Sequence, residues 1–305
     1  MARRADGVRI VPKGIERLGE RYLREGDAET PASAFPGLGS DPQARVAFVL
    51  CLGAINFGSG WFPELSKRPG LSGYRTLEAR LLDAFERDGP PPAAALRRAS
   101  GAGMAALLGQ TEAPASVAEL MELYARAWRE LGRRLDDSFA GSYSALVEAA
   151  QGSAARLVSS LLEMPLYRDV ALHGGRPVAF FKRAQLTAAD LAAALPDGLG
   201  RFRDLERLTA FADNLVPHVL RLDGALQFDR RLEARIERGE LLSPGSPEEV
   251  EIRACGVEAV ERLRRNLSER GVERHAMQLD AWLWTRGAQP RYKARPRHRC
   301  RCAFY

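Results

Sequence analysis

The sequence has little of what metal centres and disulfide frameworks require. Four cysteines occur among 305 residues, and Cys51 and Cys255 lie within apolar segments, where free thiols are usually buried. Cys300 and Cys302 form a C-x-C pair, which is a weak metal or redox spacing, and the chain has no H-E-x-x-H or C-x-x-C motif. The sequence therefore predicts no metal site and no cofactor.

Long apolar runs are also missing. The longest, residues 46–55, is about half the length needed to span a bilayer, so we interpret it as a core helix. The basic N-terminus, residues 1–4, is not followed by an apolar segment, which argues against a signal peptide. We also find no internal repeat and no low-complexity segment. A cytoplasmic protein without a membrane partner is expected.

The charge is basic but mixed. The formal net charge is +6 and the isoelectric point is about 9.4, which suits an anionic partner. Residues 291–301 carry six Lys or Arg and no acid, a run that can also be a solvated tail. Elsewhere acids and bases alternate along predicted helices, and in total 39 acids nearly match 45 bases. This pattern favours a small anionic substrate over direct nucleic-acid binding and leaves the oligomeric state open.

Apolar residues at helical spacing predict one mostly helical domain over residues 1–305. Ser116 with Glu119 resembles a capping box, and Pro247 is typical of a helix start. The predicted helices cover residues 46–55, 77–86, 117–135, 143–163, 226–238 and 248–269, and the predicted loops cover residues 30–42, 63–73, 89–92 and 242–247.

One segment departs from helical spacing. Residues 170–172 and 177–181 flank a Gly-Gly turn, a pattern typical of a short β-hairpin. A helix is expected to follow over about residues 182–195. Lys182 and Arg183 would then lie in its first turn, where free N–H groups favour an anion.

The segment 195–221 holds the strongest candidate for a reacting group. A glycine-containing turn at residues 195–200 is expected to join two helices, with Asp213 at the end of the second one, after Phe211 and before Pro217. The C-terminal helix dipole would disfavour an ionised carboxylate there, and burial in a cleft would raise its pKa further. A turn or cap before Pro217 is the alternative role for Asp213.

Two resemblances bear on this segment. The turn at residues 195–200, followed after about one helix by Asp213, resembles helix-hairpin-helix DNA glycosylases over less than a tenth of the chain. A more specific resemblance rests on eight motifs that occur in order from about residue 45 onward. They are Asn56-Phe57 with Trp61, Ser72-Gly73-Tyr74, Tyr167-Arg168-Asp169-Val170, Phe180-Phe181-Lys182-Arg183-Ala184-Gln185, Phe211-Ala212-Asp213, Val250-Glu251-Ile252-Arg253, Leu279-Asp280-Ala281-Trp282-Leu283-Trp284 and His298-Arg299-Cys300-Arg301-Cys302-Ala303-Phe304-Tyr305.

Together these motifs resemble the queuosine salvage family, the queuosine 5'-phosphate N-glycosylases. The resemblance implies a mostly helical fold related to DNA glycosylases. It also implies hydrolysis of queuosine 5'-monophosphate, which frees the base queuine for return to tRNA. The sequence departs from the family pattern at three places: Asn214-Leu215 stand where Tyr-Arg is usual, His218 stands where Gln is usual, and the motif before Trp61 has an extra residue.

This reaction would give each candidate residue a role. Cleaving a ribosyl bond builds positive charge on the sugar, so Asp213 is expected to act as nucleophile or as electrostatic stabiliser. Lys182 is a second candidate for the catalytic centre, and Asp204 is a third, with an ion pair to Arg201 or Arg207 as its alternative role. Queuine is a 7-deazapurine, so position 7 offers no nitrogen to protonate.

Further residues are expected to bind the substrate. Phe211 is the first candidate to stack on the base, although core packing is the alternative for every aromatic. Asp280 is expected to meet the secondary amine of queuine, with an exposed helix acid as its alternative. The remaining candidates are Phe57, Trp61, Phe181, Trp282 and Trp284 for stacking, Lys182, Arg183, His298, Arg299 and Arg301 for the 5'-phosphate, and His218 for the pocket wall.

Two other classes of function stay open from the residues alone. One is a non-catalytic nucleic-acid-binding protein that uses the turn at residues 195–200 and the basic tail. The other is a glycosylase of damaged DNA, which would have to flip its target base out of the duplex.

Overall fold

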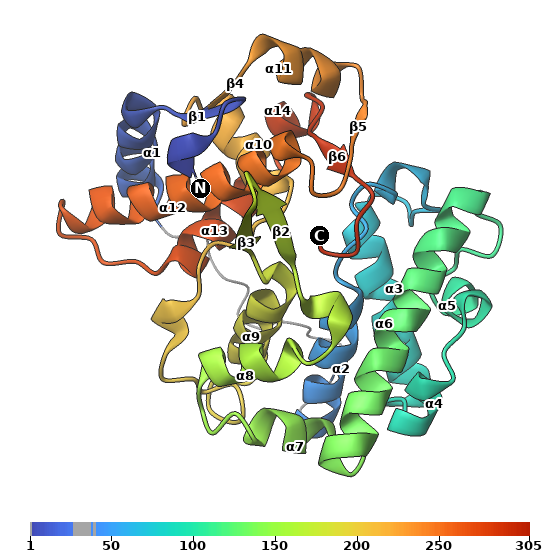
Figure 1. Ribbon diagram of the computed structural model, residues 1–305. Helices are drawn as coiled ribbons and strands as arrows, with labels where there is room; N and C mark the ends of the chain where they lie inside the picture. Colours follow the sequence, from blue (N-terminus) through green and yellow to red (C-terminus); the bar gives the residue numbers. More distant parts are fainter. Residues whose placement is uncertain (1, 27–37, 39–40) are drawn as a thin grey trace.

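The computed structural model describes residues 2–26, 38 and 41–305, which form fourteen α-helices and a few short strands (Figure 1). The predicted mostly helical class is therefore confirmed. Most of the predicted loop at residues 30–42 lies outside the described residues. Among the helices described, none is both long and apolar enough to cross a membrane.

A first hydrophobic cluster forms around α2 (Pro42–Ile55), whose residues 46–55 are all buried. The apolar run predicted as a core helix is thus confirmed. Packed around it are α3 (Gly73–Asp88), α4 (Ala93–Arg97), α5 (Gly101–Leu107), α6 (Ala115–Phe139), α7 (Tyr143–Glu148), α8 (Ala154–Leu161) and α9 (Lys182–Ala194).

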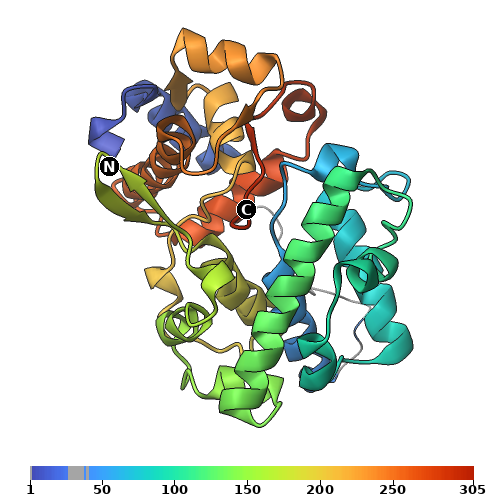
Figure 2. The same ribbon diagram turned by 45° about the vertical axis from the view of Figure 1, so that its right-hand side comes forward.

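A second cluster contains both the N-terminal helix and the C-terminal third of the chain. Helix α1 (Pro12–Glu25) packs against α12 (Pro247–Ser268), and Figure 1 shows the two side by side. In Figure 2 the C-terminus lies between the two groups of helices. The other helices of the C-terminal third are α10 (Leu215–Leu222), α11 (Arg230–Glu237), α13 (Ala276–Arg286) and α14 (Pro290–Lys293).

Three two-stranded sheets accompany the helices. The predicted hairpin is confirmed as β2 (Val170–His173) and β3 (Arg176–Ala179), with Val170 opposite Ala179. The other two sheets pair distant segments, β1 (Val8–Ile10) with β4 (Leu226–Phe228) and β5 (Leu241–Leu242) with β6 (Arg299–Cys300). Sequence analysis missed these strands because two or three residues are too few for an alternating pattern.

Three predicted helix boundaries are wrong. The helix over residues 143–163 is broken, because Gln151 and Gly152 have φ of +52° and +67° and Ser153 then caps α8. The helix over residues 226–238 begins only after β4, where Asp229 caps α11. The expected capping box at Ser116 does not form, because α6 already begins after Pro114 and the Ser116 hydroxyl bonds Glu64.

A buried ion network ties the two clusters together through Arg253 of α12. Its guanidinium is 2 % exposed and donates to Asp169 Oδ1 at 3.0 Å and to Glu249 Oε1 at 3.4 Å. Its Nε donates to the carbonyl of Ala212 at 3.0 Å. Burial alone would lower the pKa of Arg253, but Asp169 and Glu249 raise it above its ordinary value.

The C-terminal segment packs into the molecule from about residue 296 onward, whereas Arg291, Lys293 and Arg295 of the basic run are exposed. The carbonyl of Tyr305 accepts hydrogen bonds from the amides of Gly58 at 2.9 Å and Ser59 at 3.3 Å. His298 is buried, and its own carbonyl accepts from Asn214 Nδ2 at 3.2 Å. Burial lowers the pKa of His298 to about 3, so the imidazole is neutral in the folded protein near pH 7.

His218 of α10 is buried in the same way, and its Nε2 lies 2.9 Å from the carbonyl of Tyr292. Burial lowers its pKa to about 4. Sequence analysis considered both histidines as substrate-binding residues. The structure buries both rings, and His218 Nδ1 and His298 Nε2 have no hydrogen-bond partner among the described residues.

Replacing Arg253 by Met should lower the free energy of unfolding by about 3–5 kcal/mol, because the buried carboxylates of Asp169 and Glu249 lose their counter-charge. Urea denaturation measures this change. The matched control is Arg262→Ala on the same helix, which removes a half-exposed pair with Glu258 and should cost about 0–1 kcal/mol. Similar losses for the two variants would show that the network is not a stability centre.

Stability should also depend on pH through the buried histidines. Between pH about 3 and 6.5 the unfolded chain protonates His298 and the folded chain does not, so stability rises with pH across this window and is complete above it. His298→Gln should therefore reduce the loss of unfolding free energy between pH 7 and pH 5 by about 1–2 kcal/mol. Equal losses of unfolding free energy between pH 7 and pH 5 in wild type and in His298→Gln would contradict this prediction.

Candidate active site

Asp213 lies at the start of a helix, not at the end of one. The only helical segment described between residues 201 and 214 is the short 3-10 turn η5 (Leu205–Arg207), so the helix expected before Asp213 is absent. Its Oδ1 accepts the amides of Leu215 at 2.9 Å and Val216 at 3.0 Å, in the first turn of α10. Asp213 therefore lies at the positive end of a helix dipole, whereas the sequence predicted the negative end.

The expected cap role of Asp213 and a chemical role are compatible. Both amide bonds go to Oδ1, and no hydrogen bond to Oδ2 occurs in the described part of the chain. Pro217 is the third residue of α10, where a missing N–H leaves no intrahelical bond unmade. The backbone thus fixes one carboxylate oxygen and leaves the other for a ligand.

Lys182 faces this carboxylate from the first turn of α9. Its ammonium is buried and donates to the backbone carbonyl of Asn56 at 3.2 Å and to Asn56 Oδ1 at 3.3 Å. Burial lowers the pKa of Lys182, and the negative charge of Asp213 opposes this shift. The helix begins abruptly because Phe181 before it has φ of +51°, a left-handed conformation that non-glycine residues adopt at a cost.

Asp280 of α13 completes the centre from a third element. It is 4 % exposed, and its Oδ1 accepts the amide of Phe211 at 2.9 Å. Burial raises the pKa of Asp280 well above its ordinary value, and the neighbouring charge of Asp213 raises it further. Asp280 therefore holds the backbone just before Asp213 and keeps its proton to a higher pH than an exposed aspartate does.

Arg297 brings a cation to the same place, and sequence analysis missed it. The only signal was its position in the basic run of residues 291–301. Burial lowers its pKa, and Asp213 is the charge that opposes this shift. Within the described residues its guanidinium makes no hydrogen bond and no ion pair, in contrast to Arg295, which pairs with Glu237 at 2.9 Å.

A second group of charges lies farther along α9. Burial raises the pKa of Asp190 to about 7, while Lys182 opposes the shift and Glu78 adds to it. Glu78 itself is paired with Arg75 at 2.6 Å. The Arg75 guanidinium lies 5.4 Å from the ring of Trp284 on α13. Sequence analysis did not single out Asp190, because an acid in an alanine-rich helix is ordinary.

Most of the predicted stacking aromatics are packed in the interior. Phe57, Trp61 and Phe211 are at most 6 % exposed, and Phe57 meets Tyr124 edge to face at 4.9 Å. Trp282 is also buried. Trp284 and Phe181 are only partly buried, so their rings keep accessible surface beside the charged groups.

Arg183 and Arg301, both phosphate candidates, have partners within the protein. The Arg183 guanidinium donates to the carbonyls of Ala54 and Leu166 and lies between the rings of Phe57 and Tyr167, 4.6 Å from each. Arg301 pairs with Glu64 at 2.5 Å. These contacts favour structural roles. Arg299 lies half-buried in β6 and makes no ion pair with the described residues.

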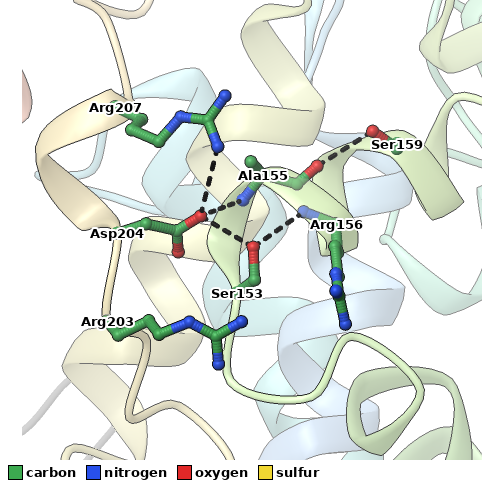
Figure 3. A pocket seen from close by; sticks show the side chains of 7 residues that line it. All are labelled: Ser153, Ala155, Arg156, Ser159, Arg203, Asp204 and Arg207. Atoms are coloured by element: carbon green, nitrogen blue, oxygen red, sulfur yellow. Dashed lines mark hydrogen bonds and ion pairs between the residues drawn. The ribbon is translucent and has the colours of Figure 1, made fainter.

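Asp204 lies in a different place, at the N-terminus of α8 (Figure 3). Its carboxylate accepts from the Ser153 hydroxyl at 2.7 Å and from the amides of Ala154 and Ala155 at 2.6 and 3.3 Å. Burial would raise the pKa of Asp204, but these hydrogen bonds lower it below its ordinary value. The Arg207 guanidinium lies 3.9 Å away, so the predicted ion pair forms, and Asp204 caps a helix.

The hollow drawn in Figure 3 is open and polar, with a volume of about 520 Å³. Arginines 156, 203 and 207 line it, but Asp213 and Lys182 do not. This hollow is therefore separate from the group of charges around Asp213. The candidate active site is that group, which includes the buried side chains of Lys182 and Asp280. Within residues 2–26, 38 and 41–305, no group of three or more His, Cys, Asp or Glu side chains is arranged to hold a metal ion.

The turn at residues 195–200 has its own internal hydrogen bonds. The amides of Gly198 and Gly200 both donate to the carbonyl of Leu195, so neither is free to hold a phosphate. A Cβ at Gly200 would lie 2.1 Å from the carbonyl oxygen of Leu191, which explains the glycine by close packing. The resemblance of this turn to a DNA-binding hairpin therefore carries no evidence for DNA binding.

Comparison with known proteins agrees with the longer resemblance. A family model described as queuosine salvage protein matches residues 38–305. A Sphaerobacter thermophilus protein named queuosine 5'-phosphate N-glycosylase/hydrolase is 39% identical over 272 residues, which cover 86% of this chain and 82% of that protein. Proteins of the same name from mouse and Schizosaccharomyces pombe are 38% and 36% identical, over 61% and 54% of this chain and 58% and 48% of their own lengths. The chain therefore belongs to the queuosine salvage protein family.

Proposed function

We propose that this protein hydrolyses the N-glycosidic bond of queuosine 5'-monophosphate and so frees queuine for return to tRNA. The observation that carries the proposal is the carboxylate of Asp213, held by two amides through Oδ1 and unpaired at Oδ2, with buried Lys182 and Asp280 beside it. Family membership and the relatives' shared name support the same reaction.

In this reaction water adds across the bond between the sugar and the base. The bond from the anomeric carbon to the base nitrogen breaks, its electron pair leaves with the base, and water supplies the new C–O bond and a proton. Positive charge builds on the sugar as the base leaves, and Oδ2 of Asp213 is the group that meets it. The fixed Oδ1 prevents the carboxylate from turning away, so little reorganisation is needed in the transition state.

The neighbouring groups set the charge of this centre. Lys182 is held by Asn56 and stays beside Asp213, whose negative charge opposes the lowering of the Lys182 pKa by burial. Asp280 keeps a proton readily, so the site avoids two adjacent negative charges and holds the backbone of Phe211 in place. Because a 7-deazapurine has no nitrogen at position 7, stabilising the cation matters more than protonating that edge of the base.

The 5'-phosphate needs a cation that is not already paired. Among the arginines near Asp213, Arg297 fits, since its side chain is half-buried and lacks a partner in the described chain. A guanidinium can bond two oxygens of a phosphate at once. In this arrangement Arg297 binds the phosphate and thereby places the attached ribose against Asp213.

Changing Asp213 to Asn should lower kcat for queuine release from queuosine 5'-monophosphate by about 10²–10³-fold or more, because the charge opposite the sugar cation is lost. Chromatography of reaction products with EDTA present measures the release. Asp197→Asn, an exposed acid in the turn after α9, is the control and should keep wild-type activity. A folded Asp213→Asn variant with full activity would contradict the proposed centre.

Changing Arg297 to Ala should lower kcat/KM for queuosine 5'-monophosphate by about 10–100-fold, the equivalent of a lost charge-assisted contact of about 1.5–3 kcal/mol. The unphosphorylated nucleoside should be affected by less than about threefold, because it lacks the contact. The exposed Arg295, changed to Ala, removes an equal charge two residues away and should alter neither value. Equal losses for nucleotide and nucleoside would exclude a phosphate role for Arg297.

A further inference from the structure

We infer that Asp190, together with Glu78 and Trp284, forms a subsite for the cationic secondary amine on the side arm of the substrate's base. This inference rests on the proposed function and adds a specificity-determining residue to it. It assigns the amine contact to Asp190 and not to Asp280, the residue expected from the sequence.

Asp190 is a carboxylate without a partner. Its side chain is only partly exposed, and no hydrogen bond or ion pair reaches it from any described residue. Other acids in its surroundings are engaged: Glu78 accepts from Arg75 at 2.6 Å and from the Tyr74 hydroxyl at 3.3 Å. A desolvated carboxylate is costly unless a cation or donor meets it. The carboxyl group of Asp190, on which Lys182 and Arg75 act only through their charges, is therefore available to a ligand.

Asp190 lies farther along α9 than Lys182, which faces the reacting carboxylate. It follows Lys182 by eight residues on α9, which is about 12 Å along the helix axis. On α13 the order is the same, since Asp280 lies beside Asp213 and Trp284 follows one turn later. The proposed site thus runs along α9 and α13. The sugar would bind near Asp213, and the second acidic group is Asp190.

The second end suits an organic cation. Trp284 is partly exposed and meets Tyr74 edge to face at 6.3 Å, so an aromatic surface lies in the same cluster as the acids. Arg75 lies 5.4 Å from the Trp284 ring, a contact typical of cations on aromatic side chains. A secondary ammonium offers two N–H donors for a carboxylate such as Asp190.

Asp280 fits this role less well. One of its oxygens accepts the Phe211 amide at 2.9 Å, and the side chain is 4 % exposed beside Asp213. An amine placed there would lie at the sugar end, where Asp213 has to meet the developing sugar cation. The side arm of queuine extends from the base on the side away from the glycosidic nitrogen, which matches the end at Asp190.

The test compares ligands that differ only in the amine arm. Asp190→Asn should lower kcat/KM for queuosine 5'-monophosphate by about 10–100-fold and change kcat/KM for 7-deazaguanosine 5'-monophosphate by less than about threefold. Asp197→Asn is the matched control, since it removes an exposed acid from the turn after the same helix. Equal losses on both nucleotides, or no loss on the first, would overturn the inference.

Measuring how the free bases bind tests the inference without catalytic turnover. By calorimetry, Asp190→Asn should weaken queuine binding about 10–100-fold and leave 7-deazaguanine binding within about threefold of wild type. If wild type hydrolyses neither nucleotide, the proposed function fails. The loss of queuine affinity in Asp190→Asn, compared with the loss of 7-deazaguanine affinity, still tests the subsite. The other outcome is that wild type hydrolyses queuosine 5'-monophosphate and Asp190→Asn does not change its preference for the amine-bearing nucleotide or base. In that case only the subsite assignment fails.

Discussion

The buried guanidinium of Arg253 is the interaction on which the rest of the structure depends. A charge with 2 % exposure has to be neutralised within the protein, and Asp169 and Glu249 do this. The same guanidinium donates to the carbonyl of Ala212, the residue before Asp213, and lies 4.6 Å from the ring of Tyr305. One side chain of α12 thus holds the β2–β3 hairpin, the C-terminal segment and the loop that carries the proposed reacting group.

The site that this network supports contains charges that the fold leaves without partners. Arg297 near Asp213 and Asp190 farther along α9 make no ion pair with other described residues. Structural arginines nearby behave differently, since Arg183 donates to two backbone carbonyls and Arg301 pairs with Glu64. Because partly buried charged groups without an ion pair cost stability, their presence near one site favours a ligand that carries both an anion and a cation.

The fold also separates packing from chemistry among similar residues. Asp204 and Asp213 both accept amides at a helix N-terminus. Both carboxylate oxygens of Asp204 accept hydrogen bonds there, but only Oδ1 of Asp213 does. Gly200 after α9 is explained by the closeness of the Leu191 carbonyl and not by a phosphate contact. The likeness of the turn at residues 195–200 to a DNA-binding hairpin therefore carries no evidence for function, and Asp213 differs from Asp204 in the oxygen that remains unbonded.

The sequence by itself determined the helical class, the core helix at residues 46–55, the β2–β3 hairpin and the family, because these depend on local spacing and on motifs along the chain. It also pointed to Asp213, Lys182 and Asp280. Only the tertiary structure decided that Asp213 begins a helix, that Asp204 caps another, and that Arg297 and Asp190 are unpaired. Burial and pairing depend on residues far apart in sequence, and no local pattern encodes which charges the fold will leave free.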